Sequence, residues 1–311
     1  MIITIKKRNL IFLLIFIVVA LPLIYAGTAT QGFKVELFIS NTAPTINLSN
    51  NSVTINLVSG DKAVLFISFN VTDQNGAGDI NASKAIVNLT LGVNSQWYQN
   101  ISDDGTREFG TCTNSSPSST VVTISCNVDV PYYANASSNW VLNVSVKDRS
   151  GAVGRTNSSG TITINTLSGL SLTYTSVNFS SVTLGQLNVL AYPHLQINNT
   201  GNDDFGQVNL SAAALVGTTT PSESIGVTQF GVNTSNSSTS LRLTFPSTGI
   251  VNLWDTLTGQ NVSFRHGHTS AFTPNADKGN LSAFLWVNVP SSGLTSQLFN
   301  STWNVTAVTT P

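Results

Sequence analysis

Apolar and polar residues alternate along most of the chain from Thr45 onward. Successive side chains of a strand point to opposite faces, so this pattern predicts strands with one face in a core. In the first half, the predicted strands are TINLSNNSVTINL (45–57), KAVLFISFNVTD (62–73), KAIVNLTLGV (84–93), STVVTISCNVDV (119–130), NWVLNVSVKD (139–148) and GTITINTL (160–167). Beyond the first 26 residues no segment keeps a helical period for three turns, so we expect an all-β fold.

The second half continues the pattern after a hinge-like NTLSGLSL at 165–172. Its predicted strands are SLTYTSVNF (171–179), HLQINN (194–199), FGQVNLSAAAL (205–215), SLRLTF (240–245), SAFLWVNV (282–289) and TWNVTAV (302–308). The segment from Gly217 to Thr239 is rich in Thr, Ser and Asn and predicts a loop-heavy region. Each half is long enough for its own core, so we predict two tandem β-sandwiches at 44–166 and 167–311.

The first 26 residues have the layout of a secretory signal peptide. A basic start is followed by an apolar stretch from Leu10 to Tyr25 that Pro22 interrupts, and small residues follow for cleavage. The alternative is an uncleaved N-terminal anchor. Both place the remaining chain outside the cell, so we expect an extracellular or cell-surface protein. Residues 27–43 are predicted to be an N-terminal strand and linker.

The composition excludes several classes of function. Only 9% of the residues are charged, and the formal net charge is −1. Thirteen Lys and Arg in 311 residues provide no basic surface, which excludes nucleic-acid binding. The chain also contains no Gly-x-Ser-x-Gly elbow, phosphate-binding glycine loop or Cys/His dyad. The sequence therefore predicts a protein that is not an enzyme.

Asn-x-Ser/Thr sequons are the most prominent motif. They occur at Asn47, Asn50, Asn70, Asn81, Asn88, Asn100, Asn114, Asn135, Asn143, Asn157, Asn178, Asn198, Asn209, Asn233, Asn236, Asn261, Asn280, Asn300 and Asn304. Chance would give about eight in a chain this rich in Asn, Ser and Thr. Glycans must project from the surface, so we expect these side chains on outward strand positions and turns, and a densely N-glycosylated surface.

Two cysteines, Cys112 and Cys126, bracket a turn-rich segment and a strand-like run. In an exported chain this spacing predicts a disulfide that closes a hairpin. Metal binding is the weaker interpretation, because no His or further Cys lies nearby.

Candidate metal ligands lie in the segment DQNGAGD, where Asp73, Asn75 and Asp79 offer oxygen atoms of the kind that Ca²⁺ binds. Asp and Asn before Gly are also typical of a tight turn, and the spacing is not that of an EF-hand loop. We expect a turn and no cofactor, with a Ca²⁺ site as the alternative. His266 and His268 are a second metal candidate, but we expect them to be polar residues of a connection near Gly267, because the spacing selects no third ligand.

Two apolar features, an N-terminal segment and a set of tryptophans, suggest binding surfaces. Phe33, Val35, Leu37 and Ile39 share one face of an extended N-terminal segment. Such a segment is either an edge strand of its own sandwich or a donor strand that adds to the sheet of a neighbouring subunit.

The five tryptophans are expected to divide between core and surface. Trp140, Trp286 and Trp303 lie in strand-like runs and are predicted core residues. Trp97 and Trp254 lie beside turns and are candidates for a sugar-binding platform.

Several segments resemble known surface modules. TAPTINL (42–48), FNVTDQNGAGDI (69–80) and VSVKDRSGA (144–152) resemble immunoglobulin-like or cadherin-like modules of secreted archaeal proteins. SVNFSSVTLGQ (176–186) and QINNTGN (196–202) resemble a second immunoglobulin-like type, in which Gly usually stands at the position of Ser180. The resemblance implies a fold and a cell-surface setting but no reaction.

Together these features predict an exported, heavily N-glycosylated protein of two immunoglobulin-like β-sandwiches. The expected function is structural, as a component of a surface layer, the cell envelope or an extracellular filament. The alternative is an adhesin or carbohydrate-binding surface protein. The expected partners are other copies of the chain or other cell-surface proteins, and the membrane is contacted only through the N-terminal segment if that segment is not cleaved.

Overall fold

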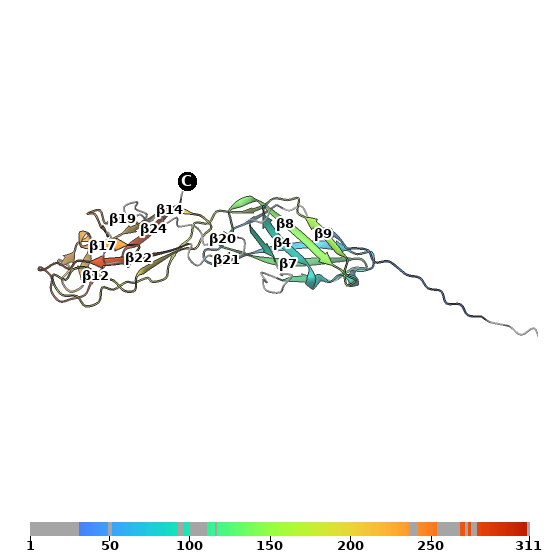
Figure 1. The fold of residues 1–311 in the computed structure, drawn as a ribbon, viewed down its shortest axis with the longest axis horizontal. Coiled ribbons are helices and arrows are strands. Elements are labelled where there is room, and N and C mark those ends of the chain that lie inside the picture. The colour runs from blue at the N-terminus through green and yellow to red at the C-terminus, as the bar shows by residue number, and fades with distance from the viewer. Residues whose placement is uncertain are drawn as a thin grey trace, which may run out of the picture. The chain divides into compact units, whose positions relative to one another are not determined.

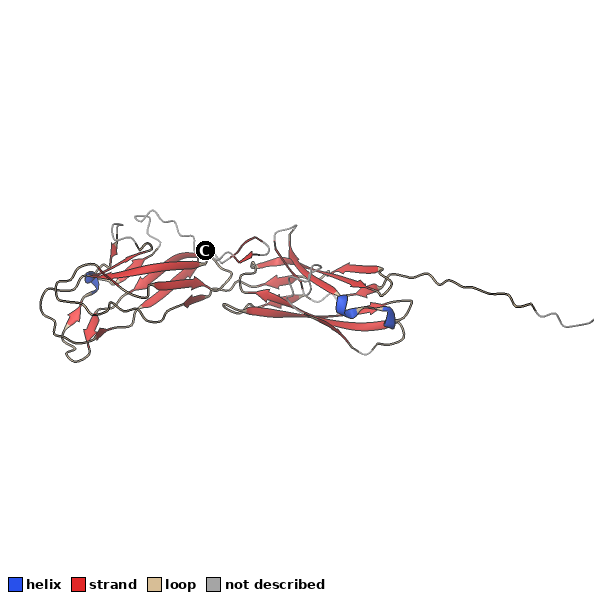
Figure 2. Ribbon diagram, turned by 60° about the horizontal axis from the view of Figure 1, so that its bottom comes forward, coloured by secondary structure: helices blue, strands red, loops and turns tan. Residues whose placement is uncertain are grey.

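The computed structural model describes residues 31–48, 52–92, 96–99, 111–115, 117–236, 242–253, 268–270, 273–274 and 279–309. The chain divides into two compact units, Met1–Ser40 and Asn41–Pro311. The described residues form strands and three short 3₁₀ helices (Figure 2), which confirms the all-β prediction. No helix among them has the length and apolar character that crossing a membrane requires. The predicted signal peptide lies outside the described residues.

Module 1, the region from Thr45 to Ile164, contains two sheets. The first has the order β1 (Thr45–Asn47), β3 (Lys62–Thr72), β7 (Val121–Pro131) and β6 (Cys112–Asn114). The second has the order β2 (Val53–Ile55), β10 (Ile162–Ile164), β8 (Ser137–Lys147), β4 (Ile86–Leu91) and β5 (Gln96–Gln99), and β9 (Val153–Asn157) also pairs with β8. The pair β2–β10 is parallel and the other pairs are antiparallel. The 3₁₀ helices Ala77–Asp79 and Ala82–Lys84 connect β3 to β4.

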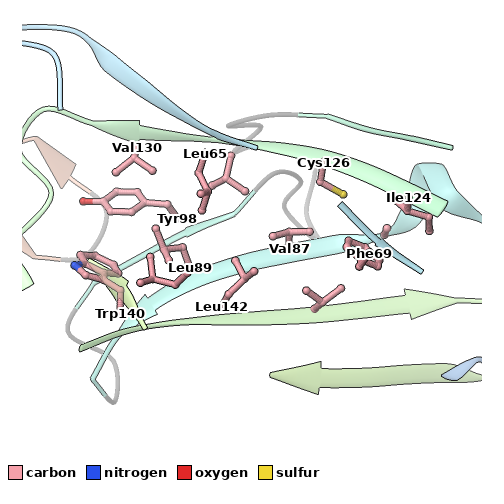
Figure 3. Close-up of a cluster of buried hydrophobic side chains, with 14 of the residues drawn as sticks. Leu65, Phe69, Val87, Leu89, Tyr98, Ile124, Cys126, Val130, Trp140 and Leu142 are labelled. Atoms are coloured by element: carbon pink, nitrogen blue, oxygen red, sulfur yellow. The ribbon is translucent and has the colours of Figure 1, made fainter. Parts of the chain in front are cut away.

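The core of module 1 lies between its two sheets. Strict alternation places Leu65 and Phe69 of β3 opposite Val87 and Leu89 of β4, as Figure 3 shows. Trp140 of β8 is 1% exposed and stacks on Tyr98 of β5, with ring centroids 5.7 Å apart. The period-two pattern was therefore sufficient to assign the inward face of each long strand.

Module 2, the region from Leu170 to Thr309, contains shorter strands (Figure 1). One sheet has the order β11 (Leu170–Leu172), β13 (Leu195–Asn199), β22 (Asn280–Val287), β17 (Phe230–Asn233) and β18 (Leu243–Thr244), with β12 (Val189–Leu190) also on β22. The others are β19 (Ile250–Asn252), β14 (Phe205–Ser211) and β24 (Asn304–Thr309), and β16 (Ser224–Ile225), β15 (Leu215–Gly217) and β23 (Phe299–Asn300). The hairpin β20 (His268–Ser270) and β21 (Thr273–Pro274) forms a separate two-stranded sheet.

Two predictions for module 2 are wrong. The predicted strand 171–179 is a strand only as far as Leu172, because the chain turns away and bridges Asn178 to Tyr192. The residue Ser180 has a φ of 59°, which explains why the resembling modules place Gly there. The predicted loop-heavy region contains β17, whose four residues are all buried. β17 was not predicted because it contains Gly231 and Asn233, and both residue types are rare in strands.

The two modules are joined through Asn202, which is 6% exposed. Its side-chain amide donates hydrogen bonds to the carbonyl oxygens of Ala134 (2.7 Å) and Asn165 (3.1 Å), and its Oδ1 accepts one from the backbone N–H of Leu167 (2.6 Å). The predicted hinge is thus held by the buried side-chain amide of Asn202, whose NH₂ group and oxygen both form hydrogen bonds.

Candidate functional site

Three carboxylates of module 1 lie together although they are distant in sequence. Asp73 follows β3, Asp79 ends the first 3₁₀ helix, and Asp148 follows β8. Their ligand oxygens all lie within 4.8 Å of one another. Asp73 is 0% exposed, Asp148 is 2% exposed, and Asp79 is half-buried. We call these three residues the acidic cluster.

A tight turn brings Asp79 back to Asp73. The Oδ1 of Asp73 accepts a hydrogen bond from the backbone N–H of Asn75 (2.8 Å), the local bond that Asp forms in such turns. Gly76 then adopts a φ of 116°, which a residue with a side chain rarely reaches. The backbone N–H of Asp79 donates to the Gly76 carbonyl (3.0 Å) and closes the turn.

Asp148 reaches the cluster through backbone pairing. Ile80 forms an isolated β-bridge with Asp148, and the backbone N–H of Arg149 donates to the Asp79 carbonyl (2.8 Å). The Oδ1 of Asp148 accepts the backbone N–H of Ala152 (2.8 Å), and its Oδ2 accepts the side-chain amide of Asn41 (2.8 Å). Burial alone would raise the pKa of Asp148, but these hydrogen bonds outweigh it and hold that pKa below its usual range.

The structure brings together two of the three candidate ligands named from the sequence, Asp73 and Asp79. Asp73 and Asp79 lie together as their spacing suggests. Asn75 is exposed, and its Oδ1 accepts the backbone N–H of Thr42 (2.9 Å). Asp148 was missed because its proximity depends on the pairing of β8 with its neighbours. The available signal was the second Asp-x-x-Gly turn, at 148–151, directly after a strong strand.

Module 2 contains an apolar groove with a volume of about 720 Å³. Its floor consists of core residues such as Leu210 and Leu285, and its rim includes Leu298, which is 66% exposed. One wall is the segment 172–182, which has no strand after Leu172. The other wall includes Phe299 of β23 and Val305 of β24. Both β23 and β24 are the last strands of their described sheets, so each has a backbone edge without a neighbouring strand.

The segment 31–40, here called the arm, has no strand assignment. Phe33, Val35, Leu37, Phe38 and Ile39 are between 75% and 91% exposed. The only ion pair within the arm joins Lys34 to Glu36, two residues of its polar face. Both interpretations of this segment, an edge strand of its own sandwich and a donor strand, stay predictions.

The predicted disulfide is present. Cys112 of β6 and Cys126 of β7 face each other in the register of the two strands and are bonded. Cys126 is 3% exposed, so the bond joins the edge strand β6 to the core of module 1.

Most of the described sequon asparagines lie at the surface. Eight are exposed and seven are half-buried: Asn47, Asn70, Asn114, Asn157, Asn178, Asn236, Asn300 and Asn304 belong to the first group, and Asn81, Asn88, Asn135, Asn143, Asn198, Asn209 and Asn280 to the second. The outward prediction is wrong for Asn233, which is 5% exposed in β17. Asn50, Asn100 and Asn261 lie outside the described residues.

The aromatic predictions hold where they can be compared with the structure. Trp140 and Trp286 are buried, and Trp303 packs partly buried against Phe230 and Phe245. Trp254 and the side chain of Trp97 lie outside the described part, as do His266 and the side chain of His268. Among the described residues of the two modules, the most exposed aromatic side chains are Tyr192 (78%) and Phe66 (77%), which were not candidates from the sequence.

No known protein family matches this chain, and no curated protein matches it. A solved "GspB Siglec domain" is 16% identical, with 46% of this chain and 68% of that chain covered and a TM-score of 0.26. A chaperone–tip adhesin complex of CFA/I fimbriae is 10% identical, with 88% and 99% covered and a TM-score of 0.30. The secreted serine protease VesC from Vibrio cholerae is 8% identical, with 85% and 50% covered and a TM-score of 0.20. TM-scores this low do not indicate a shared function, and none of these matches supports an archaeal origin.

Proposed function

We propose that this chain is an exported surface protein of two immunoglobulin-like β-sandwiches, with an adhesive function and no catalytic activity. Support for the sandwich architecture comes from module 1, where two facing sheets enclose one core with a buried tryptophan. Support for export comes from the signal-like N-terminus, the disulfide and the many sequons on the surface.

The observation that carries the adhesive function is a pair of unmatched apolar surfaces in one chain. The arm exposes a row of four alternating apolar side chains, Phe33, Val35, Leu37 and Ile39. The groove of module 2 is lined by core side chains and by residues of the edge strands β23 and β24. Exposed apolar surface of this kind marks interaction sites, because water disfavours it.

The two surfaces are complementary in chemistry. An extended segment from Phe33 to Ile39 spans about 20 Å at the rise of a β-strand. Added beside β24, it would form backbone hydrogen bonds along that edge and direct one row of apolar side chains toward Leu210 and Leu285. This is β-strand addition, in which the backbone provides affinity and the side-chain pockets provide specificity.

We assign the arm of one copy to the groove of another. This assignment gives a head-to-tail contact, which propagates because every copy carries one arm and one groove. A component of a surface layer, envelope or extracellular filament is the corresponding cellular role. The glycans on sequons such as Asn47 and Asn157 would cover the remaining surface and keep it soluble.

Sugar binding is the second candidate, favoured by the exposed aromatic side chains. Tyr192 is 78% exposed and Tyr174, on the groove wall, is 43% exposed. Aromatic faces stack on sugar rings, so these two side chains are the candidates for carbohydrate contact.

The test is the association state of the chain from residue 27 onward, measured by sedimentation velocity and negative-stain electron microscopy. We expect concentration-dependent oligomers that Leu37→Asp abolishes, because a carboxylate in an apolar groove has no partner. The matched control is Lys34→Ser, on the polar face of the arm, which should leave association unchanged. The alternative outcome is a wild-type chain that stays monomeric and binds sugars on a glycan array, with binding lost in the Tyr192→Ala variant. This result would show that adhesion occurs through sugar recognition and not through self-association.

A further inference from the structure

The acidic cluster of module 1 places three negative charges where the described structure provides no counter-charge. Asp73, Asp79 and Asp148 have oxygens within 4.8 Å of one another, and two of the three are buried. Like charges at this distance and depth repel strongly. In the described part of the chain, ion pairs join Lys34 to Glu36 and Lys62 to Asp129, and neither involves the cluster.

Asp73 provides a second, independent observation. Its residue is 0% exposed and its Oδ1 accepts the N–H of Asn75, but its Oδ2 is buried without a hydrogen-bond partner. Buried polar atoms are almost always satisfied, and a carboxylate oxygen can only accept. This oxygen belongs to a cluster in which the neighbouring groups are also acceptors. The group that satisfies all of them is a cation.

We propose that Asp73, Asp79 and Asp148 form a Ca²⁺ site in module 1. Ca²⁺ binds oxygen at 2.3–2.6 Å, so ligands on opposite sides of the ion are up to about 5 Å apart. The separations within the cluster fall inside that limit. Mg²⁺ requires near-ideal octahedral geometry at about 2.0–2.1 Å and usually keeps several waters, so a site of three protein carboxylates suits Ca²⁺ better. Water supplies the remaining ligands at the half-buried side of Asp79.

The hydrogen-bond network around the cluster suits a fixed ligand set. Asp148 is held by the side chain of Asn41 and the N–H of Ala152, and Asp73 by the N–H of Asn75. These two carboxylates are oriented by neighbours that do not themselves carry charge, as the outer partners of metal ligands commonly do. Bound Ca²⁺ would connect the ends of β3 and β8 and stabilise the start of unit Asn41–Pro311 through Asn41. This site does not depend on the adhesive function proposed above.

Calcium titration of the chain from residue 27 onward tests the site. After EDTA treatment and dialysis, we expect CaCl₂ to bind with one-to-one stoichiometry in calorimetry, with a Kd of about 10⁻⁴–10⁻³ M as in extracellular modules. At 10 mM CaCl₂ the unfolding temperature of module 1 should rise by about 5 °C. At 10 mM MgCl₂, which matches the ionic strength, it should rise by less than a third of that amount.

Two variants separate ligation from general charge effects. Asp79→Asn removes one charge at the half-buried position and should weaken Ca²⁺ binding at least tenfold. Asp61→Asn removes an exposed charge from a turn of the same module and should leave the titration unchanged. Hydrogen exchange gives a readout that needs no variant: peptides covering 41–48, 73–80 and 146–152 should exchange more slowly with Ca²⁺, and peptides of module 2 should not change.

The proposal is overturned if the wild-type chain shows no binding heat and no shift in unfolding temperature up to 10 mM CaCl₂. It is equally overturned if Asp79→Asn folds and responds to Ca²⁺ as the wild type does. An equal response to MgCl₂ and CaCl₂ would show that screening, and not ligation, stabilises the cluster. None of these results depends on whether the chain associates with itself.

Discussion

The two modules of this chain share a composition but differ in how completely they close their cores. Module 1 has three strands of eleven residues, β3, β7 and β8, and its two sheets enclose one continuous core. In the described part of module 2 the longest strand, β22, has eight residues, and an apolar groove of about 720 Å³ reaches the core. The difference lies in pairing. Module 1 pairs its long strands along their full length. In module 2 the segment 173–188 contains no strand and is joined to its neighbours by one bridge and scattered backbone hydrogen bonds, and β23 and β24 each have an open edge.

Two modules with similar strand-forming sequences can therefore differ in whether their own strands cover their core. A closed sandwich gains its stability from apolar burial on both sheets. In a module with an open groove, part of this apolar burial occurs only when a strand from another molecule fills the groove. We therefore expect module 1 to depend on its own core residues and module 2 to depend also on the arm of another copy.

The largest expected effect comes from opening the closed core. Trp140→Ala removes a ring that is 1% exposed and stacked on Tyr98, and its indole N–H donates to the Asn135 carbonyl (3.0 Å). We expect module 1 to lose about 3–5 kcal/mol of unfolding free energy, as large-to-small changes in cores do. Hydrogen exchange during urea unfolding, read on peptides of each module, measures the loss separately for the two.

Leu298→Ala, on the rim of the groove, is the variant of module 2 to compare with Trp140→Ala of module 1. Leu298 is 66% exposed, so its truncation in the isolated chain should change stability by less than about 0.5 kcal/mol. Equal losses for Trp140→Ala and Leu298→Ala would contradict the distinction between a closed and an open module.

The disulfide should give the next largest effect, confined to module 1. The Cys112→Ser and Cys126→Ser double variant opens a loop with a sequence separation of 14. The chain-entropy relation gives a loss of about 3 kcal/mol. Urea unfolding should show the module 1 transition at lower urea and the module 2 transition unchanged. A shift of the module 2 transition by the same amount would mean that the modules unfold as one cooperative unit.

The smallest effect at neutral pH concerns the buried hydroxyl of Tyr98. Burial, with a smaller contribution from Tyr133, raises the pKa of Tyr98, and its hydroxyl has no hydrogen-bond partner. A raised pKa in the folded state means that the stabilising contribution is complete below pH 10, where tyrosine titrates in the unfolded chain, and is lost as the pH rises above it. Tyr98→Phe should raise stability by up to about 1 kcal/mol at pH 7.

Above pH 10 the two proteins should diverge. The wild type should lose about 1.4 kcal/mol for each pH unit through this group, and Tyr98→Phe should lack that loss. Urea unfolding at pH 7, 10 and 11 measures the difference, with Tyr192→Phe as the control at a side chain that is 78% exposed. Identical pH dependence for the wild type and Tyr98→Phe would contradict the assignment.

Sequence patterns predicted the parts of this structure that depend on local order. Alternation located β3, β7 and β8, and the loop between Cys112 and Cys126 predicted a disulfide that the structure contains. The Asp73 and Asp79 pair was visible because a tight turn of seven residues brings both ends together. These features require no knowledge of which strand lies beside which.

The rest depends on contacts between distant segments. Asp148 enters the acidic cluster only because a bridge pairs it with Ile80. The groove exists because the segment after Leu172 leaves the sheet although its residues alternate. The central strand β17 contains Gly231 and Asn233, which pattern analysis reads as loop. The sequence pattern fails in such cases, since tertiary packing overrides local preference there.

The central claim is that the arm of one copy completes module 2 of another, and a mixing experiment tests it most directly. Leu37→Asp disables the arm and keeps the groove, and Leu298→Asp disables the groove and keeps the arm. Each variant alone should be monomeric by sedimentation velocity, and an equimolar mixture should form a one-to-one complex that does not grow further. A mixture that stays monomeric, or single variants that still form long oligomers, would contradict the account.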